Sequence, residues 1–150
     1  MLALFRATSA RVVRQSRSLF LGLAGLGLMM ASAGLLASTS GVISTTNSTL
    51  GQNASDQIGS LAVTELPNGN VVIQSPNWNG GFGAVTCLTA AEYQAGGYVI
   101  SAANSLVGSA AGHNVGGSTL VVLSNGNYVV RSGGWDDGAT TGVGAVTWVN

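Results

Sequence analysis

Residues 66–75 read LPNGNVVIQS and residues 123–132 read LSNGNYVVRS, so a chain of 150 residues contains one strand–turn–strand pattern twice. Both stretches belong to a gap-free alignment of residues 43–78 with residues 100–135, in which 14 of 36 positions are identical at an offset of 57. Four extra residues follow the second tryptophan, and residues 144–147 then repeat the GAVT of residues 83–86 at an offset of 61. An internal repeat of this size is typical of modular β architectures and argues against a single-site enzyme.

Each Asn-Gly motif lies between two runs of β-branched or apolar residues of strand length. The pairs Asn68-Gly69 and Asn125-Gly126 supply two consecutive residues that tolerate positive φ, as a two-residue type I′ hairpin turn requires. These four residues are therefore predicted to be structural turn residues. The strands that they connect are expected at 61–66 and 71–74 in the first copy and at 119–123 and 128–131 in the second.

A turn built around one tryptophan follows each hairpin and leads to a third strand, at 83–88 and 144–149. A fourth strand is expected at 98–101, and residues 89–92 have the spacing of a helix capping box. Three or four short strands per unit predict an all-β fold, with tandem antiparallel repeats of the propeller-blade type (a partial propeller) preceded by an N-terminal hydrophobic helix. The alternative is a β-solenoid, which Asn-Gly hairpins disfavour because solenoid coils are parallel.

The N-terminal segment has the layout of an export signal. Four of the five arginines come first, and the uncharged residues 19–37 follow the last of them, Arg17. This order is typical of a secretory signal peptide, but the segment is also just long enough to be an uncleaved membrane anchor. A buried core helix is the third interpretation. The first two place the rest of the chain outside the cytoplasm, either extracellular or at the cell surface or outer membrane.

We expect four parts along the chain. They are a signal peptide or membrane anchor (1–37), a Ser/Thr/Asn/Gly-rich linker with the first-repeat loop (38–57), a first β-repeat (58–100) and a truncated second β-repeat (101–150). One unit of this size buries too little apolar area to offset its backbone entropy, so at least three repeats are normally needed. We therefore expect the chain to be the start of a longer protein and to pack on further repeats.

Composition limits the partners. From residue 38 onward one arginine accompanies five carboxylates and no lysine, which gives a formal charge of −4. Phosphate binding needs clustered cations, so no nucleic acid partner is expected. Cys87 is the only cysteine, which leaves no internal disulfide. It is expected to be a small buried residue in a strand, with a reactive thiol or an intermolecular bridge as the alternative.

Few residues stand out as candidate sites. Trp78 and Trp135 occupy the same place in the two copies and are expected to pack between blades, with stacking on a sugar ring as the alternative role. Asp136 and Asp137 are candidates for calcium, because carboxylates on a Gly-rich turn can bind this ion, but the pair is not repeated. His113, the only histidine, is expected on a surface loop. No catalytic residue or cofactor is predicted.

The order of these elements resembles a known family. A small-residue loop, the GS of residues 59–60, a strand, an Asn-Gly turn, a second strand and the GAVT of residues 83–86 resemble a degenerate FG-GAP repeat, the blade unit of integrin α-subunit propellers and their bacterial relatives. More closely, SAANSLVG at 101–108, NGNYVV at 125–130 and GAVTW at 144–148 resemble an uncharacterised repeat of long, filamentous-haemagglutinin-like bacterial surface proteins. Neither copy contains the Asp-x-Asp-x-Asp-Gly loop of integrin blades, so the resemblance does not imply calcium binding.

Together these features predict an exported, cell-surface or secreted repeat protein that serves as a structural or adhesive scaffold without catalysis. Its expected partners are further repeats and an unidentified surface polymer, glycan or protein. The membrane is involved only through the N-terminal segment. The alternative is a carbohydrate-binding or hydrolytic β-propeller whose site needs blades absent from this chain.

Overall fold

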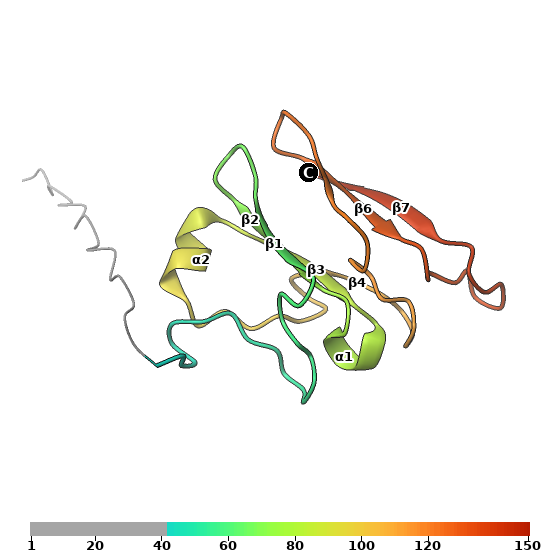
Figure 1. Ribbon diagram of the computed structural model, residues 1–150, viewed down its shortest axis with the longest axis horizontal. Helices are drawn as coiled ribbons and strands as arrows, with labels where there is room; N and C mark the ends of the chain where they lie inside the picture. The colour runs from blue at the N-terminus through green and yellow to red at the C-terminus, as the bar shows by residue number, and fades with distance from the viewer. Residues whose placement is uncertain (1–41) are drawn as a thin grey trace, which may run out of the picture. The chain divides into compact units, whose positions relative to one another are not determined.

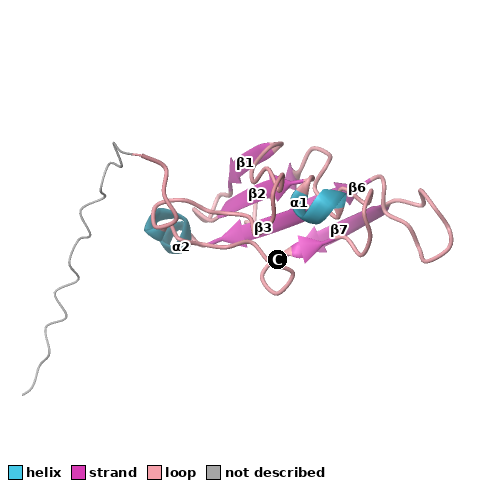
Figure 2. Ribbon diagram, turned by 90° about the horizontal axis from the view of Figure 1, so that it is seen from below, coloured by secondary structure: helices cyan, strands magenta, loops and turns pink. Residues whose placement is uncertain are grey.

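The structure is a computed structural model that describes residues 42–150, which form two antiparallel sheets of short strands joined by loops (Figures 1 and 2). The expected N-terminal hydrophobic helix, signal or anchor lies outside the described residues. Within residues 42–150, no helix is both long enough and apolar enough to cross a membrane. The predicted fold class is confirmed at the level of a mostly-β, antiparallel protein.

The first sheet is a meander in which strands that follow one another along the chain are neighbours. Its order is β1-β2-β3-β4, and all three pairings are antiparallel. The strands are β1 (Ala62–Glu65), β2 (Val71–Ser75), β3 (Ala84–Leu88) and β4 (Leu106–Val107). Two short helical segments interrupt the meander, α1 (Trp78–Gly81) before β3 and α2 (Ala90–Ala95) after it.

The second sheet repeats the first three strands. It consists of β5 (Val121–Val122), β6 (Tyr128–Ser132) and β7 (Ala145–Val149), again in sequential antiparallel order. The first residues of β2 and β6 are aligned in the sequence repeat, as are those of β3 and β7, so the two sequence offsets are also structural offsets. All pairings between these strands are antiparallel, whereas a β-solenoid predicts parallel pairing between coils.

Both Asn-Gly motifs form hairpins, but the predicted two-residue type I′ turn is wrong. The Leu66 N–H donates to the Asn70 carbonyl at 2.8 Å, and the Gly69 N–H donates to the Leu66 carbonyl at 2.8 Å, so three residues form the loop. Gly69 has a φ of +82°, and Asn68 is not among the residues with positive φ. Its side-chain Oδ1 instead accepts the Asn70 N–H at 3.1 Å. A type I turn followed by a left-handed glycine accounts for these bonds.

The second hairpin copies the first. Its Leu123 N–H donates to the Asn127 carbonyl at 2.9 Å, and Gly126 has a φ of +87°. The two loops extend in the same direction (Figure 1) and touch, because a Cβ atom built on Gly126 would lie 2.9 Å from the Asn68 Nδ2 atom. Matching loops of the two repeats therefore lie side by side.

The fourth strand predicted at residues 98–101 is wrong. This segment forms only an isolated bridge between Leu50 and Val99, and the fourth strand of the sheet is β4. Ile100 is fully buried against the first sheet. Tyr98 and Ile100, two of the apolar residues that suggested a strand, therefore cover a sheet.

The predicted capping box is confirmed at the start of α2. The Thr89 hydroxyl accepts the Glu92 N–H at 3.2 Å, and the Glu92 carboxylate accepts the Thr89 N–H at 2.8 Å. The Thr89 backbone N–H, followed by its hydroxyl, holds the pKa of Glu92 below its usual value. A reciprocal cap of this kind explains how a helix of only six residues begins at a defined position.

Each sheet has two faces, because side chains alternate along a strand. We define face A as the face that carries Val71 and Ile73 in the first sheet and Tyr128 and Val130 in the second. Face B is the opposite face, which carries Val72 in the first sheet. Face B of the first sheet packs against face A of the second.

The hydrophobic core consists of two clusters. The first covers face A of the first sheet and comprises Val71, Ile73, Trp78, Ala84, Leu88 and Ile100, with Ile58, Phe82, Tyr98 and Val107 packed against it. The second lies between the sheets and comprises Leu66, Val72, Val85, Val115, Tyr128 and Val130, with Cys87, Leu106, Leu120 and Val149 at its margin. Because side chains of both repeats form the second cluster, each repeat completes the core of the other.

Two glycines with positive φ should respond differently to substitution by alanine. Gly69 (φ +82°) has no atom within 4 Å of its Cβ position, so Gly69→Ala is expected to cost only the left-handed strain, about 1–2 kcal/mol. Gly83 (φ +78°) would place a Cβ atom onto the Val115 backbone, so Gly83→Ala is expected to cost clearly more. Urea unfolding followed by tryptophan fluorescence measures both, and equal losses would contradict this close approach.

Candidate functional site

The backbone of each tryptophan holds the turn that follows its hairpin. The Trp78 carbonyl accepts the Gly83 N–H at 3.1 Å, and the Trp135 carbonyl accepts the Gly144 N–H at 2.9 Å. Within α1, Asn79 has left-handed dihedrals (φ +51°, ψ +47°), so this segment is a pair of tight turns rather than a regular helix. The four extra residues of the second repeat therefore extend the turn without changing its anchor.

The two tryptophan side chains differ in exposure. Trp78 is 5% exposed and belongs to the cluster on face A of its own sheet, where no sugar ring can stack on it. Its packing between blades stays a prediction. Trp135 is half-buried, with its ring centroid 6.3 Å from that of His113 in an edge-to-face arrangement. Contact of Trp135 with a ligand stays a prediction.

A buried carboxylate connects the loop before the first sheet to the tryptophan turn. Asp56 is 3% exposed, and its Oδ2 atom accepts the backbone N–H groups of Gln52 and Asn53, each at 2.8 Å. Its Oδ1 atom accepts the Asn79 N–H at 2.8 Å. Burial by itself would raise the pKa of Asp56, but these backbone donors outweigh it and hold the pKa below its usual value. The loop is thus held by an ionised, hydrogen-bonded side chain.

His113 occupies the position of Asp56 in the second repeat. It was predicted on a surface loop but is 2% exposed, which corrects that interpretation. Its Nδ1 atom accepts the Ser109 N–H at 3.3 Å, and its Nε2 atom lies 3.7 Å from the Asp136 Oδ2 atom. Asp136 corresponds to Asn79, so the same two positions connect loop and turn in both repeats. The alignment of His113 with Asp56 was the only signal of this shared role.

The calcium candidates lie in the extended turn of the second repeat. The Asp136 Oδ1 atom accepts the Gly142 N–H at 2.6 Å, and the backbone of Asp137 pairs with that of Thr140 at 2.9 and 3.0 Å. Among residues 42–150, no three His, Cys, Asp or Glu side chains are grouped so that they could share a metal ion. In this structure Asp136 closes the turn and contacts His113.

Cys87 lies in β3 and is half-buried against the second sheet, beside Tyr128. Burial raises the pKa of the thiol, against a smaller opposing effect of Tyr128, and the Glu92 carboxylate raises it further. Burial also raises the pKa of Tyr128 well above its usual value, with a further contribution from Cys87. Cys87 thus packs at the margin of the cluster between the two sheets.

Face B of the second sheet is exposed, although it is largely apolar. Val146 is 74% exposed and Trp148 is 59% exposed, whereas Val85, the counterpart of Val146, is 1% exposed. The sequence carries a signal for this surface. Residues 145–149 read AVTWV, with apolar side chains on both faces, which is typical of a strand covered on both sides.

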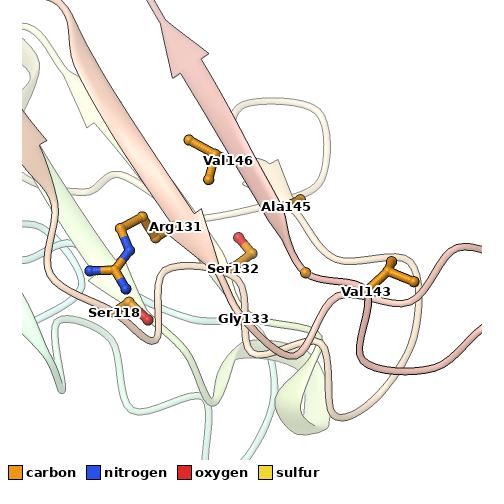
Figure 3. Close-up of a pocket in the computed structure, with 8 residues that line it drawn as sticks. Ser118, Arg131, Ser132, Gly133, Val143, Ala145 and Val146 are labelled. Atoms are coloured by element: carbon orange, nitrogen blue, oxygen red, sulfur yellow. The ribbon is translucent and has the colours of Figure 1, made fainter.

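A hollow of about 290 Å³ opens on this surface between β6, β7 and the segment that precedes β5. Figure 3 shows the Arg131 side chain reaching toward Ser118, with Val143 at the other end of the hollow. Arg131 is exposed, and no carboxylate of the described residues forms a salt bridge with it. The lining residues are Ser118, Arg131, Ser132, Gly133, Val143, Gly144, Ala145 and Val146. The hollow thus combines free N–H donors with an apolar wall.

Comparison with known proteins identifies the repeat. Residues 34–60, 65–117 and 122–150 match a family described as "Repeat of unknown function (DUF5650)", and the chain belongs to this family. The second match begins at residue 65 and the third at residue 122, which reproduces the offset of the internal repeat. No curated protein and no solved structure matches the chain significantly.

Asp56 should make stability depend on pH. Because its pKa is lower in the folded protein, its contribution is present above the unfolded pKa of about 3.9 and is lost as the pH falls through the folded value. Asp56→Asn is expected to lower stability at neutral pH by about 1–3 kcal/mol and to flatten this acid loss. Thermal unfolding between about pH 2.5 and pH 7 measures both effects.

The same charge change at the exposed Asp137 provides the control. Asp137→Asn is expected to keep the melting temperature and the acid profile of the unmodified protein. An Asp56→Asn profile that overlays the unmodified one would show that the carboxylate does not hold the loop.

Proposed function

We propose that this chain is an exported, cell-surface or secreted repeat protein that acts as a structural or adhesive scaffold without catalysis. The observation that supports this most is the repetition of one packing unit, comprising a sheet, a hairpin loop, a tryptophan turn and a loop held by Asp56 or His113. Repetition presents equivalent groups at regular spacing, which suits weak multivalent contacts. The partner would be a surface polymer, a glycan or a protein.

We further propose that each sheet is a propeller blade of the FG-GAP type. The antiparallel meander β1-β2-β3-β4 has the strand content of one blade. The two sheets also pack face to face, as neighbouring blades do. A propeller would extend this packing through further repeats.

The loops support a display role, because neutral side chains fix their conformation. The Asn47 Oδ1 atom accepts the Ser44 N–H at 2.8 Å, and its Nδ2 atom donates to the Val42 carbonyl at 3.1 Å. Asn104 makes the equivalent bonds to Ser101 and Val99, at 2.8 and 2.9 Å. Exposed loops that are held by amide side chains present a preorganised, uncharged surface to a ligand.

Export is tested by expressing the full chain with a C-terminal epitope tag in bacterial cells. We expect the tag in the medium, or on intact cells where added protease can cleave it. Leu26→Arg is expected to retain the protein in the cytoplasm, because a charge at the centre of an apolar segment costs about 2.5–3.5 kcal/mol. The intact mass of the exported chain distinguishes a cleaved signal from a retained anchor.

Thr45→Arg adds the same charge in an exposed loop and provides the control. This variant is expected to be exported as efficiently as the unmodified protein. Retention of the unmodified protein in the cytoplasm would overturn the proposed export.

A further inference from the structure

We propose that the hollow beside Arg131 is the docking site for the loop of a further repeat of this family, which would insert there as residues 113–118 insert against the first sheet. This site rests on the proposed scaffold function and identifies the contacts through which one repeat receives the next. The occupant is a peptide segment that offers two backbone carbonyls, flanked by an apolar sheet face.

The equivalent place on the first sheet is filled. At offsets of 57 and 61, most residues that line the hollow correspond to residues of the first repeat that contact the loop 113–118. The Val115 N–H donates to the Phe82 carbonyl at 3.1 Å, and Val115 forms a bridge with Gly83. A Cβ atom on Gly116 would lie 2.6 Å from the Val85 Cγ2 atom, so the loop lies directly on the sheet. The counterparts of Phe82, Gly83 and Val85 line the hollow.

The polar contact also has a counterpart. Gln74, the counterpart of Arg131, is 2% exposed, and its Nε2 atom donates to the carbonyls of Gly116 and Ser118, each at 2.8 Å. A guanidinium carries five N–H donors, so Arg131 can bind the same two carbonyls of an incoming loop. Because it is exposed and forms no salt bridge among residues 42–150, Arg131 has these donors available.

The apolar contact specifies what lies beside the loop. On the first sheet, Val85 and Cys87 are covered by Tyr128 and Val130 of the second sheet. Their counterparts Val146 and Trp148 are exposed and lack an equivalent cover among the described residues. Trp148 is much larger than Cys87, so the residue of the covering repeat that corresponds to Tyr128 must be smaller than tyrosine. The first repeat has a valine, Val71, at the position of Tyr128.

The edge of β7 is the third equivalent feature. In the first sheet β3 pairs with β4, with Ala84 opposite Val107 and Val85 opposite Leu106. Among the described residues, β7 pairs only with β6, so the N–H and C=O groups of Val146, the counterpart of Val85, face no neighbouring strand. A further repeat would therefore supply a short strand that pairs with β7 and a loop that enters the hollow.

A second copy of this chain is a poorer occupant than a further repeat. The chain has two loops of this kind, residues 56–61 and 113–118, and both already lie against the first sheet. Ile58 packs against the cluster on face A, and Val115 belongs to the cluster between the sheets. A second copy would have to release one of them before it could dock. A repeat added in register brings a loop that is still free.

The test compares the 150-residue chain with an extended chain in which residues 90–150 are repeated after Asn150, the counterpart of Thr89. The added copy carries valine in place of its Tyr128 counterpart, to accommodate Trp148. Val146→Cys in the original part provides the probe, and thiol labelling is followed by mass spectrometry at each cysteine. We expect labelling of this cysteine to be about tenfold slower, or more, in the extended chain, because an equilibrium opening must precede reaction.

Two comparisons isolate the hollow. Val63→Cys, on an exposed part of β1, is expected to label equally fast in both chains. In the extended chain, Arg131→Glu is expected to restore fast labelling at position 146, because a carboxylate cannot donate to carbonyls. Arg131→Gln is expected to keep the protection, as Gln74 serves the same contact in the first repeat.

Equally fast labelling at position 146 in both chains would overturn the docking site, even if the added repeat stays unfolded. A second pair of chains carries Trp148→Cys as the probe, and its added copy keeps the tyrosine that corresponds to Tyr128. This design reproduces the contact of Cys87 with Tyr128 in the first interface. Fast labelling of position 148 in the extended chain would overturn the site as well. Protection of the 150-residue chain that grows with its concentration would identify a second copy as the occupant and also overturn it. Arg131→Glu without effect would remove Arg131 from the contact. All measurements use purified protein, so they do not depend on whether export occurs.

Discussion

The structure depends on the contact between face B of the first sheet and face A of the second. Val72 and Val85 are buried in a cluster to which Tyr128 and Val130 of the second sheet contribute. A sheet with apolar side chains on both faces needs cover on both, and one repeat cannot supply two covers from its own residues. The sequence therefore repeats in units of one repeat, while the stability of the fold depends on the contact between neighbouring repeats.

Polar contacts fix the position at which one repeat meets the next. Gln74 binds two carbonyls of the loop that leads into the second sheet, and this fixes where that loop crosses the first sheet. Hydrophobic packing alone is non-directional, so these bonds give the stack its register. The loop–turn contact is kept with different chemistry in each copy. The carboxylate lies on the loop in the first repeat, as Asp56, and on the turn in the second, as Asp136.

Local patterns were sufficient to predict most strands, both hairpins and the cap of α2. β-Branched runs beside Asn-Gly, and a threonine three residues before a glutamate, act over a short stretch of chain and need no tertiary contact. The predictions failed where a long-range contact decides. Asn-Gly is compatible with both a two-residue and a three-residue loop, and the burial of His113 depends on the later turn that carries Asp136. Tyr98 and Ile100 cover a sheet instead of forming a strand.

The candidate site could not be predicted from single residues for the same reason. Arg131 and Val146 are unremarkable in the sequence, and each gains significance only from its counterpart in the other repeat. Gln74 and Val85 occupy the same register and are buried, so the exposure of Val146 differs from that of its counterpart. In a repeat protein, the contacts of a buried residue in one repeat therefore indicate which contacts would suit the equivalent, exposed residue of another repeat. The comparison of two copies within one chain is thus the observation from which the proposed contact surface is inferred.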